Sequence, residues 1–303
     1  MARMSDSSLA STAVDLSRLP APAVVEQIDY EAIRTALITD LQARWPAFDA
    51  TLESEPVVKL IEVFAYREMT IRQQFNDRAR QVMTAFATGS NLDQLAALVG
   101  VQRLVIDAGD PGNGVDPTYE GDDALRARIV LAPESFSVAG PEGAYRFHAL
   151  SADGRVLDAS AVSPTPGYVI VSVLSREGDG AAPPDLIAAV EAVVNGREVR
   201  PLTDFVTVQS AEIIGFAVNA TIWTFAGPDT SVVLAAARAQ LDGYLADSRR
   251  LGRDITMSGL LAALTVPGVQ RVELAAPAAT LNIDRTQAAW CTGVTIAHGG
   301  YAD

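Results

Sequence analysis

One segment of the chain, residues 54–88, carries apolar side chains at the spacing of a long amphipathic helix. Ser54 is a suitable N-cap, Pro56 is tolerated in a first helical turn, and Gly89 can end the helix. A helix of this length spans about 50 Å at about 1.5 Å per residue, longer than the helices of most small domains. The apolar positions that fall on its one face are Val57, Leu60, Ile61, Phe64, Ile71, Phe75, Val82 and Phe86.

Periodicity alone leaves two interpretations of this stripe open. The helix can be the core helix of its own domain, or it can bury its apolar face against other chains. Glu68 and Arg78 interrupt the stripe, which disfavours a two-stranded zipper and favours a mixed bundle formed with other chains. We therefore take the eight apolar residues as candidate partner-binding residues.

The apolar pattern changes its period near residue 150. Before this point we expect helices, the first of them starting after Asp29 and stopping before Pro46. After it, six strand-like runs alternate with three helical ones. The strands are expected at 156–162, 168–174, 205–209, 216–225, 269–274 and 294–297, and the helices at 184–194, 231–246 and 257–265.

The predicted fold class is α+β, with a helical N-terminal half containing a long bundle-forming helix and a C-terminal half of two small α/β modules. The expected divisions are an N-terminal arm at 1–26, a helical bundle-forming region at 27–100, a loop and helical middle region at 101–150, a first α/β module at 151–212 and a second at 213–303.

Composition argues against several partners. Of the 303 residues, 49% are hydrophobic, and 37 acidic against 23 basic residues give a net charge of −14. Neutralising phosphates requires a basic face that this sequence lacks, so we expect neither nucleic acid nor membrane as a partner. Cys291 is the single cysteine, which excludes an intrachain disulfide and fits a reducing cytoplasm. The N-terminus has no apolar run of signal-peptide length.

Histidines and the cysteine offer two weak candidates for chemistry. His148 lies near Ser151 and Asp153 in the sequence, so the three could be imagined as a hydrolase triad. No GxSxG elbow surrounds any serine, however. His298 follows Cys291 by seven residues, but a zinc site needs two further ligands. We expect no catalytic residue and no metal site from these.

Two loops could hold a charged ligand. The run SREGDGAAPP lies between a strand and a helix, where phosphate loops occur, but it has no GxGxxG and no GK[ST]. The acidic residues between 107 and 123 lack the alternating carboxylate spacing of a calcium loop. A plain surface loop and an acid-rich helix start account for them, and we expect no cofactor.

Ordered stretches along nearly the whole chain carry a more specific signal. They include DLSRLPAPAVVE, TLESEPVVKLIE and AYRE, then SVAGPEGAY and SADGRV, and later SVLSRE, VVNGREVRPLTDFVTVQSA, RLGRDI and GVQRVELAAP. From about Val14 onward the chain resembles the phage baseplate assembly protein J family of contractile-tailed phages.

The resemblance implies a structural baseplate wedge subunit without catalytic residues. Each wedge is expected to hold a second copy of this chain and a baseplate protein I-like subunit, to contact neighbouring wedges and proteins near the hub, and to transmit the trigger for sheath contraction. The resemblance also implies assembly in the bacterial host cytoplasm and residence in the baseplate of a phage or an R-type tailocin. The alternatives are a small-ligand-binding α/β protein and an enzyme with an unrecognised site.

Overall fold

A computed structural model describes residues 16, 28–49, 55–137, 139–227 and 229–302. Nearly all of the expected N-terminal arm and the expected cap residue Ser54 lie outside these residues. Two compact units make up the described chain, one ending at Gln102 and the other beginning at Arg103.

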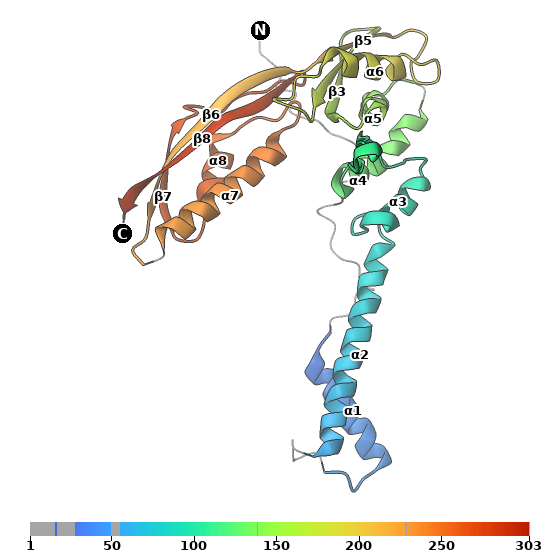
Figure 1. The fold of residues 1–303 in the computed structure, drawn as a ribbon, viewed down its shortest axis with the longest axis vertical. Helices are drawn as coiled ribbons and strands as arrows, with labels where there is room; N and C mark the ends of the chain where they lie inside the picture. Colours follow the sequence, from blue (N-terminus) through green and yellow to red (C-terminus); the bar gives the residue numbers. More distant parts are fainter. Residues whose placement is uncertain (1–15, 17–27, 50–54, 138, 228, 303) are drawn as a thin grey trace. The chain divides into compact units, whose positions relative to one another are not determined.

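The N-terminal unit is helical (Figure 1), with α1 (Tyr30–Arg44), α2 (Pro56–Gln81) and α3 (Gly89–Ala97). Asp29 caps α1 as predicted, because its carboxylate accepts from the N–H groups of Glu31 at 2.9 Å and Ala32 at 3.2 Å. α1 and α2 pack side by side. Their small shared core comprises Phe48, Val58 and Ile61, with Leu37, Ile38, Leu41 and Val57 packed around it.

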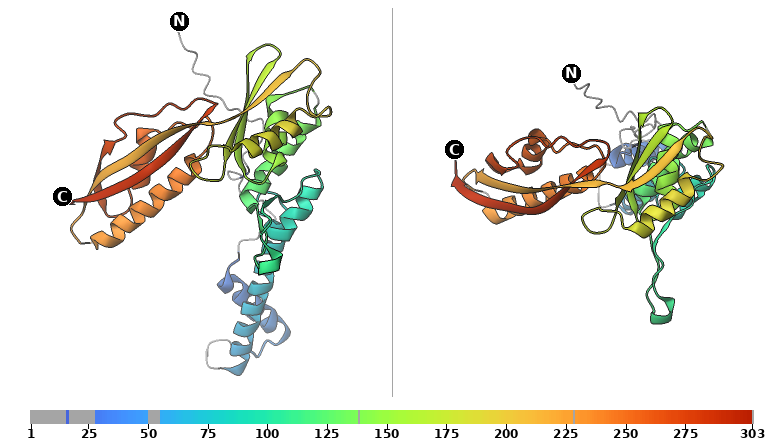
Figure 2. Two further views of the ribbon diagram at one scale, coloured as in Figure 1. Left: turned by 45° about the horizontal axis from the view of Figure 1, so that its top comes forward. Right: turned by 90° about the horizontal axis from the view of Figure 1, so that it is seen from above.

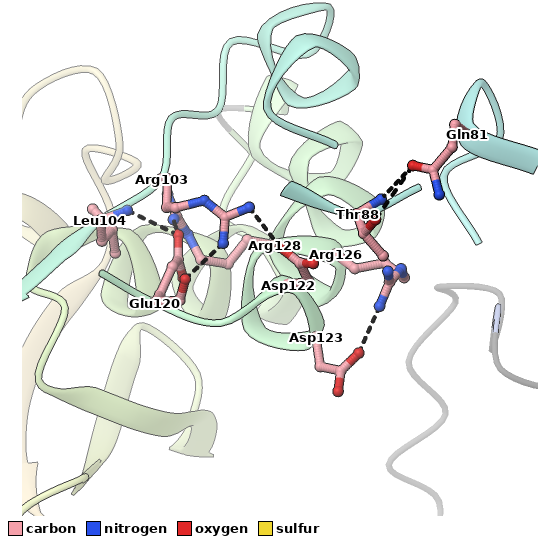
Figure 3. Close-up of polar contacts among 9 residues, drawn as sticks. All are labelled: Gln81, Thr88, Arg103, Leu104, Glu120, Asp122, Asp123, Arg126 and Arg128. Carbon is pink, nitrogen blue, oxygen red and sulfur yellow. Dashed lines mark hydrogen bonds and ion pairs between the residues drawn. The ribbon is translucent and has the colours of Figure 1, made fainter. Parts of the chain in front are cut away.

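α2 ends at Gln81, about two turns before the predicted end at Thr88, so the predicted end of this helix is wrong. The Gln81 side-chain oxygen accepts a hydrogen bond from the Thr88 N–H at 3.0 Å (Figure 3) and another from Asn91 Nδ2 at 3.2 Å. These bonds fold residues 82–88 into turns. Gly89, at φ +52°, opens α3 and does not close α2.

The C-terminal unit begins with short elements. These are β1 (Val105–Asp107), the 3₁₀ turn η2 (Pro111–Asn113), β2 (Thr118–Tyr119), α4 (Asp122–Leu131), the 3₁₀ turn η3 (Ala132–Phe136) and α5 (Glu142–Ala152). The segment expected as a plain loop therefore carries a two-stranded antiparallel pair at its ends.

The first α/β module consists of β3 (Val156–Thr165), β4 (Tyr168–Ser175), α6 (Pro184–Val194) and β5 (Phe205–Ser210). The strand order is β3-β4-β5, with β3 and β4 antiparallel and β4 and β5 parallel, so α6 is the crossover between parallel strands. Helices α5 and α6 cover the sheet (Figure 2). The buried core contains Tyr145, Val171, Val173, Leu186, Val190 and Val206, among others.

The second module consists of β6 (Glu212–Thr224), α7 (Thr230–Ser248), α8 (Met257–Leu264), β7 (Val269–Ala276) and β8 (Gln287–Tyr301). β6 is central, antiparallel to β7 and parallel to β8, and α7 runs along the β6–β8 pair in Figures 1 and 2. β8 is much longer than the predicted 294–297. Thr292 and Gly299 are extra residues relative to β6, so the side-chain alternation that marks a strand is broken twice.

The chain is thus an α+β protein with a helical N-terminal half and two small α/β modules in its C-terminal half, as predicted. Among the described residues, no helix has the length and apolar character needed to cross a membrane.

Candidate protein-interaction site

Helix α2 has one buried face and one exposed apolar face. Val58, Ile61 and Ala65 are buried, the first two of them against α1. At about 100° per residue, four other apolar residues lie within about 60° of one another on a different side of the helix. These four are between 56% and 65% exposed: Leu60, Phe64, Ile71 and Phe75.

The predicted stripe therefore combines two faces. Val57 and Ile61 belong to the core shared with α1, whereas Leu60, Phe64, Ile71 and Phe75 lie outside that core and are exposed. Val82 is exposed just beyond the last residue of α2, and Phe86 is half-buried in the following turns. Sequence reasoning missed two further exposed apolar side chains of α2, Val63 and Tyr66. Val63 points about 60° from Leu60, and that position beside the stripe was the available signal.

A buried ion pair lies at the start of the C-terminal unit (Figure 3). The carboxylate of Glu120 accepts hydrogen bonds from the Arg128 guanidinium and, at 3.0 Å, from the N–H of Leu104. Arg103 donates to the Glu120 carbonyl and to the Asp122 carboxylate, both at 2.7 Å. Burial lowers the pKa of Arg128, and the charge of Glu120 opposes that shift. The group ties the segment before β1 to α4.

The imagined triad around His148 is not assembled. Ser151 Oγ accepts a hydrogen bond from Arg128 Nε at 3.2 Å. Asp153 pairs with Arg155 at 2.9 Å, and these hydrogen bonds hold the pKa of Asp153 below its usual value. Burial lowers the pKa of His148, whose ring lies edge-on to Phe147. The three side chains thus serve separate packing and pairing roles.

Cys291 and His298 also make separate contacts. Both lie on β8, opposite Phe216 and Ile222 of β6 respectively. The His298 ring is 3.1 Å from Thr224 Oγ1, and the Cys291 thiol donates to the Gly293 carbonyl at 3.4 Å. No cluster of three or more potential metal ligands occurs in the part of the chain that the structure describes.

The two candidate ligand loops are held by internal contacts. In the loop after β4, the Gly178 carbonyl accepts from Arg249 Nη2 at 2.8 Å, so a carbonyl and not an amide N–H meets the charged group. In the acidic segment, Asp107 and Asp110 accept from the N–H groups of Gly109 and Gly112 in local turns.

A hollow of about 510 Å³ lies between α7 and β8. Its lining includes the apolar side chains of Phe216, Leu245 and Trp290. Arg238 pairs with Asp242, and its Nε lies 2.9 Å from both carboxylate oxygens. Arg249 lies over the Trp290 ring at 4.6 Å. The polar groups around the hollow are therefore largely engaged with one another.

The fold defines a multi-module α+β protein, and the exposed apolar face of α2 is a candidate surface for contact with other chains. Family models support this class along most of the sequence. A Baseplate J-like N-terminal domain matches residues 53–110, a Baseplate J-like central domain matches 137–210, and a Baseplate J-like protein C-terminal domain matches 216–297.

A curated relative agrees with the family models. Baseplate protein J of Escherichia phage P2 is 47% identical over 297 residues, which covers 95% of this chain and 98% of that protein. A solved structure, the six-fold symmetrised baseplate of the anti-feeding prophage, matches at 18% identity and a TM-score of 0.36, covering 61% of this chain and 43% of that chain.

The chain belongs to the baseplate J-like family. Membership gives it a structural role in a phage-type baseplate, an assembly in which it meets other baseplate proteins. The expected resemblance is thereby confirmed.

Proposed function

We propose that this chain is a wedge subunit of a contractile-tail baseplate and that the exposed face of α2 joins a helical bundle with other chains. The partners are a second copy of the chain and a baseplate protein I-like subunit. The observation that supports this proposal is the exposure of four apolar side chains on one side of α2: Leu60, Phe64, Ile71 and Phe75. Contiguous exposed apolar side chains on a helix indicate an interaction surface.

The proposed action is mechanical and not catalytic. The wedges link into a ring around the hub, and a rearrangement of subunit interfaces transmits the trigger for sheath contraction. A switch of this kind requires interfaces with two stable arrangements. Assembly takes place in the host cytoplasm, and the finished particle is a phage or an R-type tailocin.

The test is co-expression of the full chain with its neighbouring tail proteins, followed by mass measurement of the purified complex. The variant F64D/F75D places charges on the exposed face and should abolish the wedge complex. The control V232D changes an exposed apolar residue of α7 and should leave the complex intact. Circular dichroism should show that the double variant keeps its α/β modules folded. A normal complex from F64D/F75D contradicts the proposal.

The runner-up function is small-ligand binding in the hollow between α7 and β8. A metabolite that binds there raises the melting temperature of the purified chain, and the rise grows with the logarithm of the ligand concentration once this exceeds Kd. The substitution L245W fills the hollow. A melting shift that occurs in wild type and is absent in L245W favours this second function. No shift across a metabolite panel argues against it.

A further inference from the structure

The exposed face of α2 repeats with a period of eleven residues. Leu60 recurs as Ile71, Phe64 as Phe75, and Arg67 as Arg78. Eleven residues make three turns at about 3.67 residues per turn, which is close to the natural period of an α-helix. A stripe with this period runs nearly straight along the helix, so a partner helix can follow it without strong left-handed supercoiling.

The two arginines of the repeat lie inside the apolar stripe. At about 100° per residue, Arg67 and Arg78 point within about 20° of the direction of Leu60. Both are exposed, and neither guanidinium pairs with any residue that the structure describes. Other basic residues of α2 are paired: Lys59 with Glu62 at 3.0 Å, and Arg72 with Glu68 at 2.7 Å.

One carboxylate of α2 lies at the edge of this face: Glu68 points about 80° from Leu60 and is already paired with Arg72 at 2.7 Å. Within about 60° of Leu60, the remaining residues of α2 are apolar or neutral: Pro56, Val57, Val63, Phe64, Ile71, Gln74, Phe75 and Gln81. A chain that covers the face therefore encloses two guanidinium groups that this unit leaves without counter-charges. Enclosing a charge is unfavourable unless the partner supplies an opposite charge.

Charge also decides which of the two proposed bundle partners lies directly on the exposed face of α2. The same face of a second copy brings two more arginines, and its nearest carboxylate, Glu68, is already paired with Arg72, so face-to-face pairing of two α2 helices places like charges together. A helix of a different chain with apolar residues and carboxylates has complementary charge. Along the axis, eleven residues separate Arg67 from Arg78 by about 16 Å at about 1.5 Å per residue.

We propose that the exposed face of α2 receives an acidic amphipathic helix from a chain other than this one. Two of its carboxylates, about 16 Å apart, pair with Arg67 and Arg78, and its apolar residues pack on Leu60, Phe64, Ile71 and Phe75. The inference rests on the proposed function, because it names the chemistry of the partner in the bundle.

The test uses the near absence of lysine from this chain. Lys59 is the only lysine, so R67K/R78K adds two amines on the exposed face and keeps the positive charge. A carbodiimide joins an amine to a carboxylate only where the two are in direct contact. The complex co-expressed with the tail proteins is treated with the carbodiimide, and the linked peptides are identified by mass spectrometry. The matched control R250K/R253K replaces two exposed arginines of the second module.

The expected result is a link from each introduced amine to a different chain, at two acidic residues of one helix, with no link to that helix in the control. Links to a second copy of this chain overturn the inference. A wedge complex that forms but gives no link at either position also overturns it and leaves the proposed function standing. A wild-type chain that forms no complex overturns both.

Charge reversal gives an independent measurement. R67E/R78E should weaken the complex at least about tenfold, and added salt should lower the affinity of this variant less than that of wild type, because salt screens the new repulsion. R250E/R253E changes the net charge equally and should leave both properties unchanged. Equal affinity for R67E/R78E and wild type overturns the pairing of these arginines with carboxylates.

Discussion

The carboxylate of Asp158, on β3, accepts a hydrogen bond from the backbone N–H of Leu251 at 3.1 Å, across 93 positions of sequence. Its other oxygen pairs with Arg146 of α5 at 3.0 Å. Asp158 is only 7% exposed. The buried residues at this joint between the two modules are few: Leu174, Ala211, Leu251 and Ala288. A polar residue therefore holds together a joint with little apolar surface.

We predict that D158A destabilises the C-terminal unit by about 3 kcal/mol, because it leaves the Arg146 charge and the Leu251 N–H without their acceptor. D158N keeps an acceptor for Leu251 but loses the ion pair, so its effect should be smaller. Urea unfolding followed by circular dichroism measures both. Equal midpoints for wild type and D158A contradict a structural role for this residue.

The local elements of the C-terminal half could be predicted from sequence because each has a clear start signal and period. Pro184 opens α6, and strands such as 168–174 are runs of β-branched residues. The length of β8 could not be predicted, because Gly299 interrupts the side-chain alternation of this strand. Gly299 lies against the Trp223 ring, where a Cβ would collide. That constraint depends on a strand some 75 residues earlier, which local periodicity does not contain.

The division of the α2 stripe into two faces was also beyond sequence reasoning. Leu60 and Ile61 are adjacent and equally apolar, and only the position of α1 decides which of them is buried. The Asp158–Leu251 contact likewise depends on tertiary structure. The expected boundaries at residues 26, 100, 150 and 212 stay predictions, to be checked by limited proteolysis.

The two faces of α2 predict effects of unequal size on stability for two adjacent substitutions. Ile61 is 6% exposed in the core shared with α1, so I61A should lower the unfolding free energy of the N-terminal unit by about 2 kcal/mol. L60A removes an exposed side chain and should change it by less than about 0.5 kcal/mol. Thermal unfolding of the isolated full chain measures both. A larger loss for L60A than for I61A contradicts the assignment of the faces.

The buried pair of Glu120 and Arg128 predicts non-additive effects. E120Q leaves the Arg128 cation buried without its counter-charge, and R128M does the same to the Glu120 anion, so each should cost about 3 kcal/mol. The double variant E120Q/R128M has no buried charge here, and its loss should be smaller than the sum of the two by at least about 1 kcal/mol. A double-mutant cycle in urea measures the difference. Strict additivity contradicts a direct coupling of the two side chains.

The burial of His148 predicts an acid-dependent loss of stability. Burial lowers the folded-state pKa of this imidazole below 6.5, so at intermediate pH the unfolded chain binds a proton that the folded chain does not. Its contribution to stability is therefore fully present above pH 6.5 and declines as the pH falls from there toward the folded-state pKa. H148Q does not titrate, and its melting temperature should fall less than that of wild type between about pH 7 and about pH 5. The two melting curves should differ by a constant amount above pH 6.5, where the wild-type imidazole is neutral in both states. Parallel curves throughout the acid range indicate that protonation of His148 does not oppose folding.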